Sequence, residues 1–310
     1  MGIYMGFFIT LSAVATMLIY AVPAYLLGKF KITKFEHIPV LAAILLYVCT
    51  PAIIVNSFQK AHFSAQMLLR LGAFLILAFA LQLAILGIAW LFVRKKSHKV
   101  QYRISTIATS VGNCGFFGIP LIEALLPENP EAMVYVAVFS ITMNTIAFTF
   151  GSLIISQDKK YIKPKKIFLN PAMLGAFVAI PLFVFGIQLP AFILSILDAF
   201  VKLSTPLCMF VLGMRLASIK FSDVFTNLSI YPSIFAKQII LPLLAALIAK
   251  LLPFDPIMET SLVIMCSCPV ASVVLNLSEL IGQGQKSAAN CVLLGTILSI
   301  FTIPAVLILV

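Results

Sequence analysis

Ten long apolar stretches occupy most of this 310-residue sequence, and they leave very few folds open to the chain. Hydrophobic residues make up 62% of the chain and charged residues 10%, a balance that water-soluble domains do not reach. A bilayer core about 30 Å thick requires roughly 20 apolar residues for each helix that crosses it. The predicted spans are 6–28, 38–58, 68–93, 102–126, 132–156, 169–187, 192–215, 226–250, 257–280 and 287–309. The sequence therefore predicts an all-α, multi-pass integral membrane protein with ten transmembrane helices.

Lysine and arginine are distributed unevenly over the connections between these spans. The odd-numbered connections hold sixteen of them, whereas the even-numbered connections hold only Lys60, Arg70 and Lys250. Membrane proteins keep basic residues on the cytoplasmic side, so we expect a cell-membrane protein with both termini outside the cytoplasm. The same loops explain the formal net charge of +11, which predicts contacts with membrane lipids and no nucleic-acid partner.

Three proline landmarks recur in the same order in the two halves of the sequence. The matched pairs are Pro23 with Pro181, Pro51 with Pro206 and Pro120 with Pro269. Each half contains five spans, an odd number, so the second half enters the membrane in the opposite sense. The predicted organisation is two inverted five-helix repeats, residues 1–156 and 169–310, joined by a basic cytoplasmic loop at 157–168.

The fourth span contains the densest group of residues that interrupt a helix. Gly112, Gly115, Gly118 and Pro120 lie within nine residues of one another. Proline removes a backbone donor and glycine adds conformational freedom, so this helix should break. Pro269 and its small polar neighbours predict a similar break in the ninth span. Unpaired backbone groups are costly in hydrocarbon, so we expect the two breaks to cross near the midplane and to line a polar cavity.

Polar side chains near these two breaks are the predicted ligands of a substrate. The side chains that can orient a carboxylate without a buried charge are Ser110, Asn113, Ser272 and Asn276, and half-helix ends at a crossing attract an anion. An alternative role for them is hydrogen bonding between helices. Lys237, inside the eighth span, is expected either to serve an anionic or proton-linked site or to extend toward the cytoplasmic interface.

Several functional classes lack the residues that they need. No predicted span has an acidic residue near its centre, which disfavours cation exchange. The chain has no metal-binding spacing of histidines and cysteines and no hydrolase motif, so we predict no metal, no cofactor and no enzymatic activity. A channel and a sodium-coupled symporter of the bile-acid-transporter type stay as alternatives. In the seventh span, Lys202 follows Asp198 by four residues, which predicts a helical ion pair.

Over nearly its whole length the chain resembles the auxin efflux carrier family. The similarity is strongest around Gly112-Asn113, Gly115 and Pro120 in the fourth span, and from Pro269 through Ser272 in the ninth. This resemblance implies a fold of ten helices in two inverted repeats, with helices 4 and 9 broken at prolines that cross. It also implies a scaffold made from the first two helices of each repeat and a mobile transport domain made from the other three.

In such a fold the substrate would bind at the crossing and move by an elevator-like motion. Pro120 and Pro269 would take the crossover positions, and Asn113 would face the substrate. Bacterial relatives are associated with dicarboxylates such as malate or malonate, so we expect a secondary active transporter of a small organic anion, such as a carboxylate. The oligomeric state stays open, with a homodimer as one arrangement. The predicted substrate-binding residues are Gly112, Asn113, Gly115, Pro120, Lys237, Pro269, Ser272 and Asn276.

Overall fold

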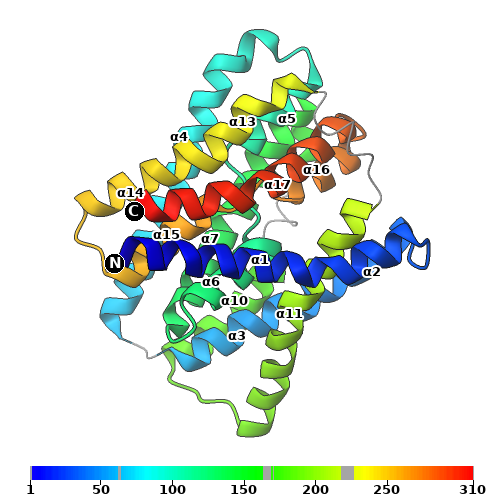
Figure 1. The fold of residues 1–310 in the computed structure, drawn as a ribbon. Coiled ribbons are helices and arrows are strands. Elements are labelled where there is room, and N and C mark those ends of the chain that lie inside the picture. Colours follow the sequence, from blue (N-terminus) through cyan, green and yellow to red (C-terminus); the bar gives the residue numbers. More distant parts are fainter. Residues whose placement is uncertain (1, 62–63, 163–168, 170, 218–226, 310) are drawn as a thin grey trace.

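A computed structural model describes residues 2–61, 64–162, 169, 171–217 and 227–309, and these residues form an all-helical protein (Figure 1). Within that part of the chain, β-structure is limited to a single isolated bridge. The predicted loop at 157–168 lies partly outside the described residues. The α-helices are α1 (Gly2–Lys29), α2 (Ile38–Ile44), α3 (Thr50–Lys60), α4 (Ala65–Val93), α5 (Val100–Ala108), α6 (Ile119–Leu125), α7 (Pro130–Ile146), α8 (Ser152–Ser156), α10 (Pro171–Val184), α11 (Ala191–Ala217), α13 (Tyr231–Phe235), α14 (Leu241–Leu251), α15 (Pro256–Ser267), α16 (Val273–Ile281) and α17 (Gln285–Leu309).

Among the described residues, six helices are long and apolar enough to cross a membrane. They are Ile38–Lys60, Ala65–Lys96, Pro130–Ser156, Ala191–Ala217, Leu228–Leu251 and Gln285–Ile308. Shorter apolar helices are Val14–Lys29, Cys114–Leu125, Pro171–Val184 and Pro256–Ser267. Each predicted span overlaps one of these helices, so the prediction of an all-α protein with several membrane spans is confirmed. Two of the shorter helices adjoin the predicted breaks, where a full-length helix was not expected.

In the described part of the chain, four π-helical turns interrupt the helices, and three of them end directly before an X-Pro pair. These three turns, Leu45–Cys49, Cys114–Gly118 and Ala236–Ile240, precede Pro51, Pro120 and Pro242. Proline has no N–H for the carbonyl four residues earlier, and its ring collides with that carbonyl in a regular α-helix. A wider turn moves the carbonyl away and lets it accept from another residue. The helices therefore pass these prolines without a full break.

The closest helix packing joins α1 to α11 and α3 to α10. At Gly213 of α11, an added Cβ would collide with the carbonyl oxygen of Ala21, so only glycine allows this approach of the two backbones. At Gly175 of α10, an added Cβ would lie 2.9 Å from the Cα of Pro51. Close backbone approach at small residues is the usual way in which membrane helices pack. These two helix pairs form a layer on one side of the molecule (Figure 1).

Asp198 on α11 pairs across this layer, and its predicted ion pair with Lys202 is wrong. The carboxylate instead accepts from Lys60 Nζ at 2.8 Å and from Asn56 Nδ2 at 2.9 Å, both on α3. A lysine four residues away on the same helix competes poorly here, because the α3 side chains approach the carboxylate directly. The contact ties the end of α3 to α11.

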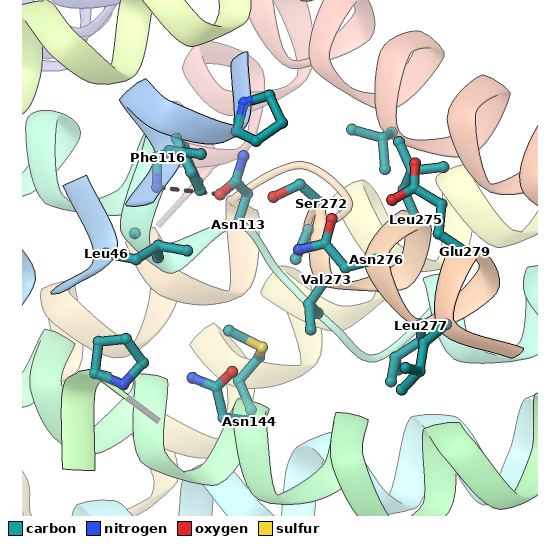
Figure 2. Close-up of a pocket in the computed structure, with 18 of the residues that line it drawn as sticks. Leu46, Asn113, Phe116, Asn144, Ser272, Val273, Leu275, Asn276, Leu277 and Glu279 are labelled. Carbon is teal, nitrogen blue, oxygen red and sulfur yellow. Dashed lines mark hydrogen bonds between the residues drawn. The ribbon is translucent and has the colours of Figure 1, made fainter. Parts of the chain in front are cut away.

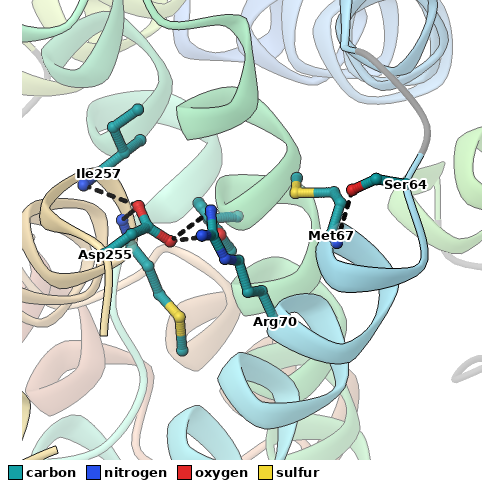
Figure 3. Close-up of polar contacts among 7 residues, drawn as sticks. Ser64, Met67, Arg70, Asp255 and Ile257 are labelled. Carbon is teal, nitrogen blue, oxygen red and sulfur yellow. Dashed lines mark hydrogen bonds and ion pairs between the residues drawn. The ribbon is translucent and has the colours of Figure 1, made fainter. Parts of the chain in front are cut away.

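A second polar cluster joins the three helices α4, α7 and α15 (Figure 3). Asp255 caps the N-terminus of α15, where Oδ1 accepts from the backbone N–H groups of Ile257 and Met258 at 3.0 Å each. Its Oδ2 lies 3.3 Å from Arg70 Nη1 of α4 and accepts from Tyr135 Oη of α7 at 3.4 Å. One carboxylate thus holds the ends of α4, α7 and α15 together.

Asp255→Ala should lower the thermal stability of the protein because it removes the helix cap and leaves Arg70 without its carboxylate. The cap alone contributes about 1 kcal/mol, and each kcal/mol corresponds to roughly 2–4 °C in a domain larger than 150 residues. Asp255→Asn keeps an oxygen for the cap and should lose less. The melting temperatures of the purified proteins in detergent test this, and an Asp255→Ala variant that melts with wild type would contradict it.

Candidate functional site

The site is built around two helices that are interrupted in mid-course. α5 ends at Ala108 and helical structure resumes at Cys114, while α15 ends at Ser267 and α16 begins at Val273. Between these helix ends, the two segments of the polypeptide run antiparallel and form a backbone bridge between Gly112 and Val270. The interrupted segments therefore cross each other inside the protein. We call residues 109–113 and 268–272 the crossing segments.

Backbone groups of the two crossing segments satisfy one another. The N–H of Asn113 donates to the carbonyl of Pro269 at 2.7 Å, and the N–H of Ala271 donates to the carbonyl of Val111 at 3.0 Å. Pro269 lacks an N–H and accepts only, so it fits this pairing at no cost. Non-helical backbone at this depth is stable in a membrane protein only with such partners or beside a polar cavity.

Small residues and helix ends determine where the crossing falls. A Cβ at Gly112 would lie 3.0 Å from Lys237 Nζ, so a larger residue would press the crossing segment against that side chain. The prediction that Pro120 marks the crossing is wrong, because Pro120 lies in the first turn of α6, beyond the π-helical turn. The π-helical turn before it accommodates the missing N–H, so the helix that begins at Cys114 continues past Pro120. The break falls earlier, at Gly112.

Lys237 lies behind the crossing segments with no exposed surface. It belongs to the π-helical turn Ala236–Ile240, and its Nζ donates to the carbonyl of Cys266 at 2.6 Å, in the last turn of α15. Carbonyls at the C-terminal end of a helix carry partial negative charge, which an ammonium group complements. The side chain therefore does not extend to an interface, and it is not among the residues that line the cavity described next.

A cavity of about 1070 Å³ opens beside the crossing (Figure 2). Its walls come from α2 and the turn that follows it, from α7 and from α17, and the crossing segments with α16 form one side. Most of the lining is apolar, and Leu46, Phe116, Val273 and Leu277 are examples. A mostly apolar pocket with a few convergent polar groups is typical of a small-molecule site.

The polar groups of this cavity gather around Asn113. Its Oδ1 accepts from the backbone N–H of Phe116 at 3.1 Å, which caps the turn after the break. Among the hydrogen bonds of the described residues, none uses Asn113 Nδ2 as a donor, so this amide can serve a ligand. Figure 2 shows Ser272 and Asn276 next to Asn113, with Asn144 of α7 on the opposite wall.

Half of the residues predicted from the sequence line the cavity. Asn113, Gly115, Ser272 and Asn276 do so. The others lie behind it or beside it, and these are Gly112, Pro120, Lys237 and Pro269. Gly112 and Pro269 take part in the backbone pairing of the crossing, Pro120 lies farther along in α6, and Lys237 lies behind the crossing segments.

Several polar residues that line the cavity were not predicted as site residues, and Asn144, Arg215 and Glu279 are examples. Asn144 lies in a helix with no breaker nearby, so nothing in the sequence separates it from a packing residue. Arg215 lies near the end of α11 and was counted with the basic loops, and Glu279 lies at the end of the ninth predicted span. Arg215, Lys286 and Glu279 are the charged members of the lining within the described residues, two cations against one carboxylate. That balance favours an anionic ligand.

Groups of three or more histidine, cysteine or acidic side chains that could hold a metal ion do not occur among the described residues. All six cysteines are free and buried. The lining therefore offers amide, hydroxyl and guanidinium donors for a ligand.

Comparison with known proteins agrees with the membrane fold. A family model described as membrane transport protein matches residues 9–307. An uncharacterized transporter of Methanocaldococcus jannaschii is 28% identical over 310 residues, covering 95% of this chain and 97% of the relative. A Rhizobium meliloti protein provisionally named a malonate transporter is 25% identical over 231 residues, covering 71% of this chain and 70% of the relative. The chain belongs to the membrane transport protein family of the auxin efflux carriers.

Proposed function

We propose that this protein is a secondary active transporter of a small organic anion, with a carboxylate as the cargo. The observation that carries this proposal is the cavity against the crossing, where the Asn113 amide and two cationic side chains, against one carboxylate, lie in a mostly apolar lining. The name of the Rhizobium meliloti relative supports a carboxylate. The mostly apolar walls would hold the carbon skeleton, and the amides would orient the charged group.

The substrate would bind through Asn113, Ser272 and Asn276, beside the backbone of Gly115. Ser272 directly precedes α16, and the first N–H groups of a helix carry partial positive charge toward an anion. Gly112 and Pro269 would act through the crossing that they form, and Pro120 through the start of α6. Their part in binding is to hold the ligating groups in place.

The positive charge of Lys237 would offset the negative C-terminal ends of the broken helices. α5 and α15 both end at the crossing, so their negative ends meet where α16 presents its positive end. The buried ammonium group of Lys237, bonded to the Cys266 carbonyl, offsets that negative potential near the anion site. In this role it supports substrate binding without touching the substrate.

The helix contacts support the inverted-repeat organisation that the proposal uses. If residues 1–156 and 169–310 are equivalent, each contact should have a counterpart with the halves exchanged. The pair α1–α11 has the counterpart α10–α3, the pair α4–α5 has α14–α15, and the pair α6–α7 has α16–α17. In this scheme ten helices form two five-helix repeats, and both termini face the outside, as the basic loops predict.

Transport would follow from a division of the helices into two bodies. The layer of α1, α2, α3, α10 and α11 would be the scaffold, and the remaining helices with the crossing would carry the substrate. The cavity has walls from both groups, so it lies at the boundary where a sliding motion would alternate access. A homodimer joined through the scaffold would fit this motion.

Uptake by purified protein in liposomes tests the function. We expect radiolabelled malonate to enter, uptake to accelerate when the liposomes are preloaded with malonate, and uptake to be the same in sodium and in potassium. Acceleration by preloading distinguishes a carrier from a channel, which shows none. Strict dependence on sodium would favour the symporter alternative, and failure of every carboxylate tested to enter would overturn the proposal.

A further inference from the structure

Arg215 occupies a position that the proposed site does not yet use. It lies in the last turn of α11, half-buried, and lines the main cavity. It also lines a small adjoining cavity together with Asn113, Phe116 and Ser272. A guanidinium group thus shares a pocket wall with the amide and hydroxyl that the proposed function assigns to the substrate.

One face of α16 carries polar side chains from the crossing toward Arg215. Ser272, Asn276 and Glu279 follow one another at the spacing of one helix face, so all three side chains point to the same side. Figure 2 shows Asn276 between Asn113 and Glu279, all directed into the cavity. Glu279 also interacts electrostatically with Arg215. The polar lining therefore runs from uncharged donors at the crossing to a charged group at Arg215.

We propose that Arg215 selects dicarboxylates by binding the second carboxylate of a substrate whose first carboxylate lies at Asn113. This inference rests on the proposed function and adds a specificity-determining residue to it. A guanidinium carries five N–H donors in a planar fork, so it can hold a substrate carboxylate in bidentate fashion and still interact with Glu279. Lysine cannot reproduce that geometry.

A substrate with one carboxylate would gain less attraction from Arg215 in the same cavity. Its apolar end would offer the guanidinium no carboxylate and would gain nothing from the fork. The carboxylate of Glu279 repels an anion that does not engage Arg215, which widens the difference between the two substrate classes. Arg215 therefore controls the preference for a dicarboxylate over a monocarboxylate more than the binding of a carboxylate as such.

Equilibrium binding of malonate and of propionate, which differ in the second carboxylate, tests this role. Wild type should prefer malonate by about tenfold or more. Arg215→Gln should lose that preference through weaker malonate binding, while the propionate dissociation constant should stay within about twofold. Arg215→Lys keeps the charge and should retain part of the preference. Lys29→Gln removes an exposed cation at the neighbouring end of α1, outside the cavity, and should bind as wild type does.

The outcomes separate this inference from the function on which it rests. Equal weakening of malonate and propionate in Arg215→Gln would overturn the selective role and leave the carrier intact, as would a wild type without preference. If wild type binds neither acid, the proposed function itself fails. If Arg215→Gln does not fold, Arg215→Lys decides, because a malonate preference equal to that of wild type would contradict the need for the planar fork.

Discussion

Asn113→Asp is expected to lower carboxylate uptake by roughly tenfold or more, with a folded protein and an unchanged crossing. The change keeps an oxygen where Asn113 Oδ1 accepts from the N–H of Phe116, so the cap of the turn stays in place. It replaces the amide donor, which faces the cavity, by a negative charge. This variant therefore tests the repulsion of an anionic substrate without removing the hydrogen bond that caps the turn.

Asn113→Ala is the companion variant, because it removes both the donor and the cap. It should bind carboxylates weakly as well, and the lost cap should cost about 1 kcal/mol of stability. Uptake by liposomes and the melting temperature, measured on all three proteins, distinguish the two effects. If Asn113→Asp takes up carboxylates at the wild-type rate, Asn113 does not bind the substrate.

Lys237→Met is expected to reduce transport at least about tenfold, by removing the charge while nearly keeping the volume. Lys237 has no exposed surface, and its Nζ donates to the carbonyl of Cys266 at 2.6 Å. Methionine leaves that carbonyl without its donor, which costs about 1–3 kcal/mol. It also leaves the negative ends of α5 and α15 uncompensated beside an anion site.

Gln238→Met is the matched control for this change. Gln238 is the next residue of the same π-helical turn, equally buried, and donates through Nε2 to the carbonyl of Gly295 in α17 at 2.7 Å. Gly295 packs against Val270 of the crossing segment, so this change also removes a buried donor beside the crossing, but it removes no charge. It should lower the melting temperature to a similar degree and leave transport near wild type. If both variants transport equally well relative to their stability, the charge of Lys237 plays no part in function.

Hydropathy predicted an all-helical protein with several membrane spans, and the structure confirms this. Apolar stretches of about 20 residues have one stable form in hydrocarbon, the helix, so their helical structure can be predicted from the sequence. The effect of a proline inside such a stretch cannot be predicted from the sequence. Pro206 lies within α11, Pro51 follows a π-helical turn, and Pro269 lies in a crossing segment. The packing of the neighbouring helices decides among these outcomes.

Site residues next to the helix breaks could be predicted from the sequence. Site residues whose position depends on which face a helix turns toward the cavity could not. Glycine and proline around Asn113 indicated both the break and the amide beside it. Sequence alone does not give the face that a helix turns toward a cavity, so Lys237 seemed as suited to the site as Asn276. Arg215 was read as a cytoplasmic loop cation, because its position near the end of α11 hides its contact with the cavity.

The most direct test of the account is whether a carboxylate occupies the cavity at the crossing. Leu275→Cys places a thiol on the cavity wall beside Asn276, and the six native cysteines are buried, so a charged thiol reagent should report this position. We predict that malonate slows its labelling, that the uncharged malonamide does not, and that neither affects Lys29→Cys outside the cavity. Labelling of Leu275→Cys at the same rate with and without saturating malonate would contradict a substrate site at the crossing.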